Sequence, residues 1–185
     1  MRAKFIGVNM IRGVFQRTRN LRTRLLALSV IARQGASKAD FLISKIETRK
    51  KYLKAKTKYS DESRKAFVKR EIESLTRIQQ RLTYVQVILE MIALRAETAA
   101  IAGSIVSTIA VIRELLKQIR KRGFVALPGI SLVLEEIYEA TGEVLAEAMN
   151  VEYSDTPVLA KAEAEKILEE AEVIAKERLT NRFSI

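Results

Sequence analysis

The stretch that decides the fold is residues 61–122, DESRKAFVKREIESLTRIQQRLTYVQVILEMIALRAETAAIAGSIVSTIAVIRELLKQIRKR. It contains one glycine and no proline, and apolar residues recur in it with a 3.5-residue repeat. The two apolar rows are Val68, Leu75, Leu82, Leu89, Ala96, Gly103, Ala110 and Ile78, Val85, Ile92, Ala99, Val106. A repeat of this length predicts one very long helix that packs against a partner helix.

The nearest partner is the segment that precedes this stretch. Its heptad rows are Leu25, Ala32, Ala39, Ile46, Leu53 and Leu28, Gly35, Leu42, Arg49, Lys56. We therefore predict an all-α fold built on a long antiparallel helical hairpin, Leu21–Lys58 with Asp61–Arg122. Small residues in the middle of the first arm would let a partner helix approach closely, and Gly35 and Ser37 are also compatible with a break in that arm.

A second apolar stripe emerges past residue 100, which predicts that this part of the helix packs on two sides. Its members, which we consider candidate assembly residues, are Ile101, Ile105, Ile109, Ile112 and Leu116. One side would face the hairpin, and the other a later helix or another subunit.

Two shorter helices are expected after a hinge at Gly123–Gly129. They are Ile130–Met149 and Val158–Leu179, both rich in glutamate. The chain then has four parts: a basic amphipathic segment at 1–20, the hairpin at 21–122, the hinge and a short acidic helix at 123–150, and an acidic C-terminal helix at 151–185.

The composition argues against catalysis. The 185 residues include no Cys and no His, which excludes Ser-His-Asp and Cys-His catalysis and the usual metal ligands. The two Gly-rich phosphate-binding motifs, G-x-x-x-x-G-K-[ST] and G-x-G-x-x-G, are both absent. Pairs of glutamates at helical spacing are best explained as solvated surface acids. We expect no enzymatic activity, no metal or other cofactor and no small-molecule substrate.

The net charge of +11 is unevenly distributed along the chain. Residues 1–60 carry +14, residues 61–122 carry +5, and residues 123–185 carry −8. Such asymmetry indicates a basic end that meets a polyanion and an acidic end that imitates one. The basic half suits duplex nucleic acid as well as an anionic membrane, and net charge does not choose between them.

Residues 1–20 have the pattern of a basic amphipathic helix that lies in a membrane interface. The alternative is an N-terminal helix that packs on the core. The residues expected to contact anionic lipid are Phe5, Ile6, Met10 and Ile11 by insertion, and Arg17, Arg19, Arg22, Arg24, Arg49, Lys50, Lys51 and Lys54 by charge. No secretory signal is evident, and the longest uncharged run, 15 residues at Thr98–Ile112, is shorter than the ~20 that span a bilayer. We expect a cytoplasmic, peripheral membrane protein.

The helix order, the charge split and the terminal segment AEKILEEAEVIAKERL at Ala164–Leu179 together resemble the ESCRT-III family, in particular its archaeal CdvB-type cell-division members. The resemblance covers nearly the whole chain. It implies a hairpin that polymerises with itself and with paralogues into filaments at the inner face of the cell membrane, where they remodel or sever it in cell division. It also implies that the acidic C-terminal helix folds back and holds the monomer inactive. The residues that would do so are Ile167, Leu168, Ile174 and Leu179.

The family's AAA ATPase docks on short C-terminal motifs that this chain lacks. Pro128 and Pro157 are the only prolines, and Ala175 stands three residues before Arg178-Leu179, where the helical motif has leucine. The resemblance therefore implies an ATPase partner that is reached indirectly, through a co-assembling paralogue. Two other interpretations stay open: a nucleic-acid-associated basic coiled-coil protein, and a soluble helical adaptor or chaperone.

Overall fold

The computed structural model describes the backbone of residues 3–57, 61–124, 127, 129–148 and 156–183, and within these ranges the side chains from 19 to 148 and from 159 to 181. The described residues form five α-helices and no strand. They are α1 (Ala3–Thr57), α2 (Glu62–Ala102), α3 (Ile105–Lys121), α4 (Ser131–Ala148) and α5 (Thr156–Phe183). The predicted all-α fold is confirmed.

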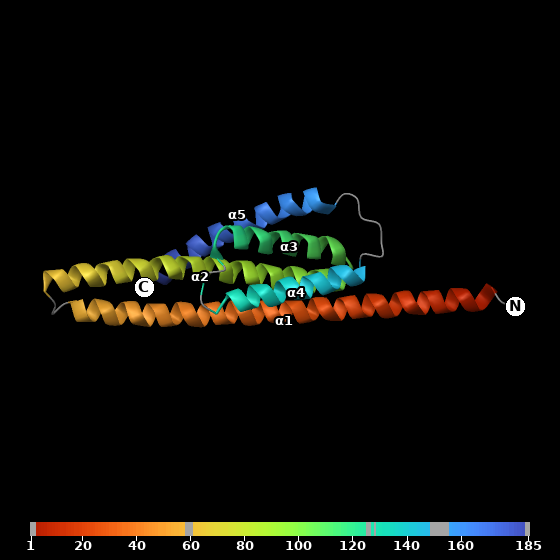
Figure 1. Ribbon diagram of the computed structural model, residues 1–185, viewed down its shortest axis with the longest axis horizontal. Coiled ribbons are helices and arrows are strands. Elements are labelled where there is room, and N and C mark those ends of the chain that lie inside the picture. The colour runs from red at the N-terminus through yellow and green to blue at the C-terminus, as the bar shows by residue number, and fades with distance from the viewer. Residues whose placement is uncertain (1–2, 58–60, 125–126, 128, 149–155, 184–185) are drawn as a thin grey trace.

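Helices α1 and α2 form the antiparallel hairpin that the heptads predict (Figure 1). At 55 residues, α1 is about 82 Å long. Asp61 begins α2 as its N-cap, and its carboxylate accepts a 2.8 Å hydrogen bond from the Arg64 amide. Helix α1 does not break at Gly35. A Cβ atom at that position would lie 2.4 Å from Cγ1 of Val133 in α4, so glycine is required there because a helix packs closely against it.

The prediction that the second arm continues to Arg122 is wrong. Helix α2 ends at Gly103, which has a left-handed φ of 84° and donates its amide to the Ala99 carbonyl at 2.9 Å. After Ser104, α3 folds back along α2 (Figure 1). The physical reason is that α3 has a broad apolar face, and folding back buries that face within one chain.

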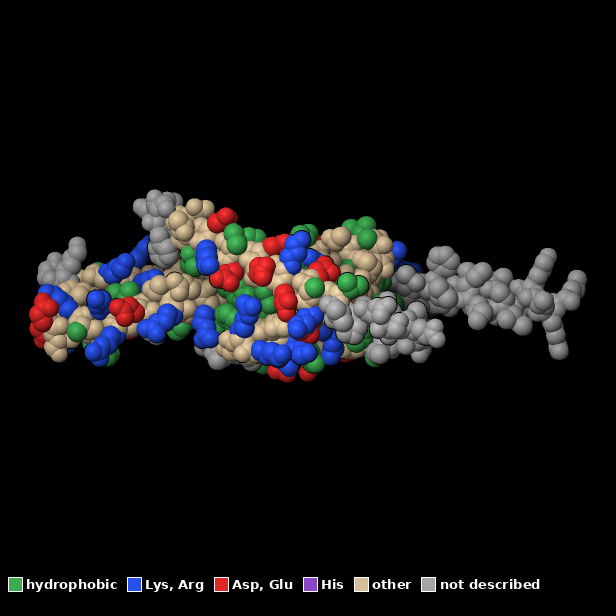
Figure 2. Space-filling view, turned by 90° about the horizontal axis from the view of Figure 1, so that it is seen from above, with side chains coloured by type: hydrophobic (Ala, Val, Ile, Leu, Met, Phe, Trp, Pro, Cys, Tyr) green, Lys and Arg blue, Asp and Glu red, His purple; other side chains and the backbone are tan. Residues whose placement is uncertain are grey.

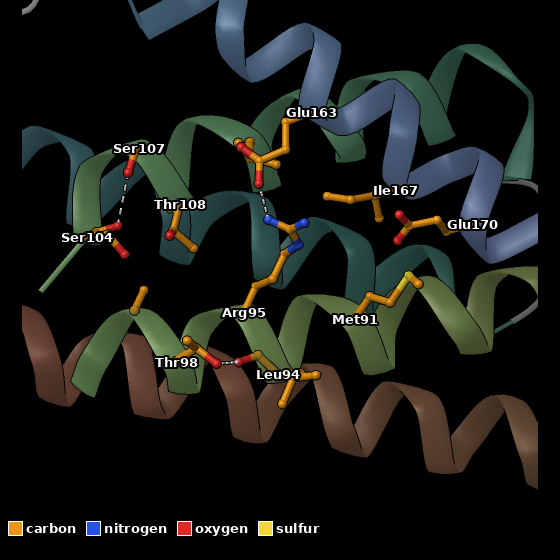
Figure 3. A pocket seen from close by; sticks show the side chains of 12 residues that line it. Met91, Leu94, Arg95, Thr98, Ser104, Ser107, Thr108, Glu163, Ile167 and Glu170 are labelled. Atoms are coloured by element: carbon orange, nitrogen blue, oxygen red, sulfur yellow. Dashed lines mark hydrogen bonds and ion pairs between the residues drawn. The ribbon is translucent and has the colours of Figure 1, made fainter. Parts of the chain in front are cut away.

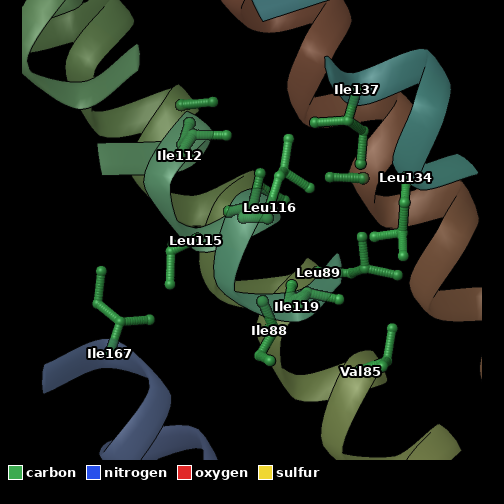
Figure 4. Packing of buried hydrophobic residues seen from close by; sticks show 14 of the residues in the cluster. Val85, Ile88, Leu89, Ile112, Leu115, Leu116, Ile119, Leu134, Ile137 and Ile167 are labelled. Atoms are coloured by element: carbon green, nitrogen blue, oxygen red, sulfur yellow. The ribbon is translucent and has the colours of Figure 1, made fainter. Parts of the chain in front are cut away.

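Helix α3 lies at the centre of the hydrophobic core. Figure 4 shows its side chains between those of three other helices, with Leu89 of α2, Leu134 of α4 and Ile167 of α5 among the neighbours. Helix α4 covers α1 and α3, and α5 crosses α3 and α2. The hairpin is therefore the base on which the three shorter helices are assembled.

One heptad row of α1 also differs from the prediction. The second buried row that accompanies Leu25 and Leu53 contains Ser29, Ala36, Ile43 and Lys50. The predicted row one residue earlier includes Gly35, which lies between Val133 of α4 and Leu89 of α2. Two helices cover α1, so it has apolar residues on two sides, and the sequence pattern does not distinguish which side faces α2.

Candidate regulatory site and membrane surface

The acidic helix α5 is held on the hairpin by a narrow apolar stripe. Its buried members are Ala160, Ala164, Ile167, Leu168, Ala171 and Ala175. These residues recur every three or four positions, which places them on one side of the helix. Most of them are alanines, so α5 lies close to its neighbours, and Ile167 and Leu168 are its fully buried large side chains.

An ion pair closes the C-terminal end of this contact. Nη1 and Nη2 of Arg178 donate to the two carboxylate oxygens of Glu90 in α2, at 3.0 and 2.7 Å. The hydrogen bond with Glu90 raises the pKa of Arg178 above its already high value. Both side chains are more than a third exposed, so the pair sets the direction of α5 more than it stabilises the fold.

Tyr84 of α2 joins α5 to the hinge that leads into α4. Its hydroxyl donates to the Leu168 carbonyl at 3.3 Å and accepts from Nη1 of Arg122 at 3.1 Å. Its ring lies 5.2 Å from that of Phe124. Burial raises the pKa of Tyr84, so the hydroxyl keeps the proton that it donates to α5. One residue of α2 therefore contacts both α5 and the hinge.

An open cavity of about 490 Å³ separates α5 from the turn between α2 and α3 (Figure 3). The Arg95–Glu163 ion pair crosses it from α2 to α5, and Ile167 points toward it. Ser107 donates to the Ser104 carbonyl at 3.2 Å on the α3 side. Over the described residues, no three acidic side chains lie close enough together to hold a metal ion.

The four candidate autoinhibitory residues are brought together on this site. Ile167 and Leu168 are buried, and Ile174 and Leu179 are half-buried. Their inhibitory role stays a prediction.

The candidate assembly residues divide into two groups. Ile105, Ile109, Ile112 and Leu116 are all buried in the core beside α5 or α4, whereas Ile101 is 83% exposed near the end of α2. In this conformation the four α3 residues are covered within the monomer, so their use in assembly requires a change of conformation. Their role in assembly stays a prediction.

The basic residues expected to contact lipid lie along α1. Phe5, Ile6, Met10, Ile11 and Arg17 fall in its first turns, where the side chains are outside the described residues. The exposed members of the set are Arg19, Arg22, Arg24, Arg49, Lys51 and Lys54. Two of them are partly neutralised, because Arg24 pairs with Glu143 and Arg49 with Glu71, each at 3.0 Å.

The prediction that Lys50 contacts lipid is wrong. Lys50 is 7% exposed and lies in the hairpin seam, where its ammonium group donates to Oε1 of Gln79 at 3.0 Å. Nε2 of Gln79 donates in turn to Glu47, also at 3.0 Å. Burial lowers the pKa of Lys50. Position 50 is seven residues after the buried Ile43, and that spacing was the signal available in the sequence.

Sequence reasoning also missed Tyr84, Glu90 and Arg178. A tyrosine inside the otherwise aliphatic buried run of α2 was a usable signal, because a buried tyrosine hydroxyl needs a hydrogen-bond partner. Nothing in the sequence pairs Arg178 with Glu90, which are 88 positions apart.

Figure 2 shows the face that carries α3 and α5. Acidic and basic side chains alternate over its centre, and basic side chains predominate toward the tip of the hairpin. Over the described residues, no helix combines the length and the apolar character needed to cross a bilayer.

The chain is similar to two archaeal proteins over most of its length. It is 28% identical to cell division protein B1 of Sulfolobus acidocaldarius over 168 residues, which cover 88% of this chain and 78% of that protein. The resemblance to the CdvB-type proteins of the ESCRT-III family is confirmed. The CdvB-type likeness extends to cell division protein B3 of the same organism, at 27% identity over 157 residues, 83% of this chain and 91% of that protein. No family model and no solved structure matches the chain.

Proposed function

We propose that this chain is an ESCRT-III-like cell division protein that polymerises on membranes and remodels or severs them. The observation that carries the proposal is the position of α5. This acidic helix covers part of the broad apolar face of α3 through a narrow apolar stripe and a few polar contacts. The names of the two archaeal relatives support the cell-division role.

In the proposed cycle, the conformation with α5 docked is the resting monomer. Departure of α5 exposes Ile167 and Leu168 on one side and the apolar face of α3 on the other. Exposed apolar surface of this extent is unfavourable in water, so a neighbouring subunit replaces α5. Straightening at Gly103 would then join α2 and α3 into the longer arm that the heptad pattern allows.

The basic residues of α1 supply the attraction to the membrane. Each Lys or Arg near an anionic surface contributes about 1 kcal/mol, and screening by salt weakens it. Helix α5 packs on α2 and α3, so membrane contact through α1 does not require its release. We further propose that the polymer includes paralogues, that it forms at the inner face of the cell membrane at the division site, and that an AAA ATPase acts on it through them.

Deletion of residues 151–185 tests the autoinhibition. The truncated chain should pellet at concentrations where the full chain stays in the supernatant, and electron microscopy should show filaments or rings. An unchanged monomer content would exclude autoinhibition by α5. Discrete particles of fixed size would support an adaptor instead.

Sedimentation with liposomes tests the membrane claim. The full chain and the truncated chain are mixed with anionic or neutral vesicles at low and high salt, with duplex DNA as the competing polyanion. We expect binding to anionic vesicles that falls with salt. Absence of binding at low salt, or tighter binding to DNA at matched salt, would refute the membrane claim.

A further inference from the structure

A second cleft, of about 340 Å³, lies where the C-terminal half of α5 crosses α2 (Figure 1). It shares no lining residue with the cavity that Arg95 crosses. Its walls come from three places: Arg81 and Tyr84 of α2, Arg122 and Phe124 where α3 ends, and Ala175 and Leu179 of α5. We call it the hinge cleft. Its size is at the lower end of the range for small-molecule sites.

The interior of the hinge cleft is apolar. Tyr84 and Ala175 are buried, and Phe124 and Leu179 are half-buried. The ring of Phe124 lies 5.2 Å from that of Tyr84, and the Arg81 guanidinium lies 5.3 Å from the Phe124 centroid. Because Phe124 already has a tyrosine and a cation as neighbours, the remaining apolar wall favours an aliphatic chain over another stacked ring.

Cations gather at the rim of the cleft. Arg81, Arg122 and Lys176 all line it, against one carboxylate, that of Glu172. Lys176 pairs with Glu172 at 2.8 Å, and this hydrogen bond, followed by the more distant charge of Arg122, lowers the pKa of Glu172. Two positive charges are therefore in excess among the described residues that line the cleft. A site with apolar walls and a cationic rim suits an amphipathic anion.

We propose that the hinge cleft binds a single-chain anionic amphiphile. The alkyl chain lies among Tyr84, Ala175 and Leu179, and the phosphate or carboxylate head group lies between Arg81 and Arg122. Guanidinium groups suit such a head group because their planar N–H donors match its oxygens in pairs. The small volume accepts one chain, so the ligand enters as a free molecule and not as part of a bilayer.

Binding of this ligand is coupled to the position of α5. Helix α5 supplies one wall of the cleft, so the complete site exists only while α5 is docked. A ligand that binds only the docked conformation stabilises it by mass action, by the factor 1 + [L]/Kd. At this step the inference rests on the proposed function, because a ligand that keeps α5 in place would delay assembly. The binding itself does not depend on that function.

Two simpler ligands use only part of the cleft. Inorganic phosphate meets the guanidinium groups and leaves the apolar walls uncovered. A fatty alcohol covers the walls and leaves the two arginines without a counter-charge. An anionic amphiphile uses both parts together, so the three ligands serve as probes of the proposal.

Calorimetric titration of the full chain tests the site. The probe is decyl phosphate, kept below the concentration at which it forms micelles, and inorganic phosphate and decanol are the comparison ligands. Gln80→Glu adds a carboxylate at the rim, because Gln80 is an exposed residue that lines the cleft. It should weaken decyl phosphate binding by about fivefold to tenfold, since it repels the head group and competes for the guanidinium groups. Gln34→Glu makes the same charge change at an exposed position on α1 and should leave binding unchanged.

Amide hydrogen exchange then tests the coupling. Saturating decyl phosphate should slow the exchange that proceeds through release of α5, by about 100-fold when its free concentration is 100 times Kd. The same ligand should reduce the fraction of full chain that pellets and should not affect the chain without residues 151–185.

The outcomes separate this inference from the proposed function. No binding of decyl phosphate, equally tight binding of decanol or of inorganic phosphate, or equal binding by the Gln80→Glu and Gln34→Glu variants would overturn the inference. None of these results affects the proposed function if the truncated chain still assembles. Binding that slows exchange in α5 without any effect of α5 on assembly would support the site and remove the proposed autoinhibition.

Discussion

Replacement of Ile167 by alanine should release α5. Ile167 is 1% exposed and packs against α3 in the core. Removing a fully buried isoleucine side chain down to alanine costs about 2–5 kcal/mol, since the transfer free energy is lost and a cavity remains. This cost falls on the docked arrangement alone, because a released α5 exposes position 167 to water in the parent chain and in the Ile167→Ala variant alike. At 1.4 kcal/mol per factor of ten, the ratio of docked to released α5 should fall by about 30-fold to several thousandfold.

Amide hydrogen exchange and sedimentation measure this shift. Exchange in α5 should accelerate strongly while exchange in α1 and α2 stays slow, and the fraction of chain that pellets should rise. Val173→Ala is the matched control, because it removes an aliphatic side chain from the same helix at a position that is 56% exposed. That variant should behave like the parent chain.

Two results would contradict the reasoning. If Ile167→Ala accelerates exchange equally in all helices, Ile167 stabilises the whole fold and does not specifically hold α5 in place. If Ile167→Ala and Val173→Ala are indistinguishable, the packing of α5 on α3 is not what holds it.

Three further changes probe the turn at Gly103 and the hairpin. Gly103→Ala should favour a straight α2–α3 arm by about 2 kcal/mol, half because alanine disfavours the left-handed φ of 84° and half because alanine has the higher helix propensity. Gly142→Ala, the control, should not lengthen the molecule. Small-angle scattering that shows no lengthening of the Gly103→Ala variant would contradict this prediction. Lys50→Met removes the ammonium group that donates to Gln79 in the hairpin seam, and should lower the unfolding free energy by about 1–3 kcal/mol. In denaturant melts, the further change Gln79→Leu should restore most of the lost unfolding free energy. The hydrogen-bonded Arg33 guanidinium lowers the pKa of Glu97 below 4.5, so the stabilisation from this ion pair is present above that pH and is lost as the pH falls through the folded pKa. Glu97→Gln should therefore flatten the acid limb of a curve of unfolding free energy against pH, and an unchanged limb would contradict the assignment.

Much of the architecture is readable from residue order. A 3.5-residue repeat with few glycines and prolines determines long helices, because only that period keeps one apolar row facing a partner. The charge split likewise follows from composition. It places the cations on α1 and the acids on α4 and α5, and the Arg24–Glu143 pair joins the two groups. These properties are local, so the sequence carries them without knowledge of the fold.

The site depends on longer-range choices. Tyr84 contacts Leu168 and Arg122 only because α5 and the hinge cross α2 at that point. Lys50 is buried only because its side of α1 faces α2, whereas the neighbouring row, with Gly35, lies between α2 and α4. Both rows contain apolar residues, so periodicity alone does not rank them.

The sequence by itself therefore determined the helices, the hairpin pairing and the direction of the charge asymmetry. The tertiary structure alone decided that the second arm turns at Gly103, that α3 is enclosed, and which side of α5 is buried. The physical reason is a difference in energy scale. A glycine in a helix changes local stability by only about 1 kcal/mol, and burial of a few large side chains outweighs it. The turn at Gly103 is thus set by the surfaces that it brings together, and those surfaces lie far apart in the chain.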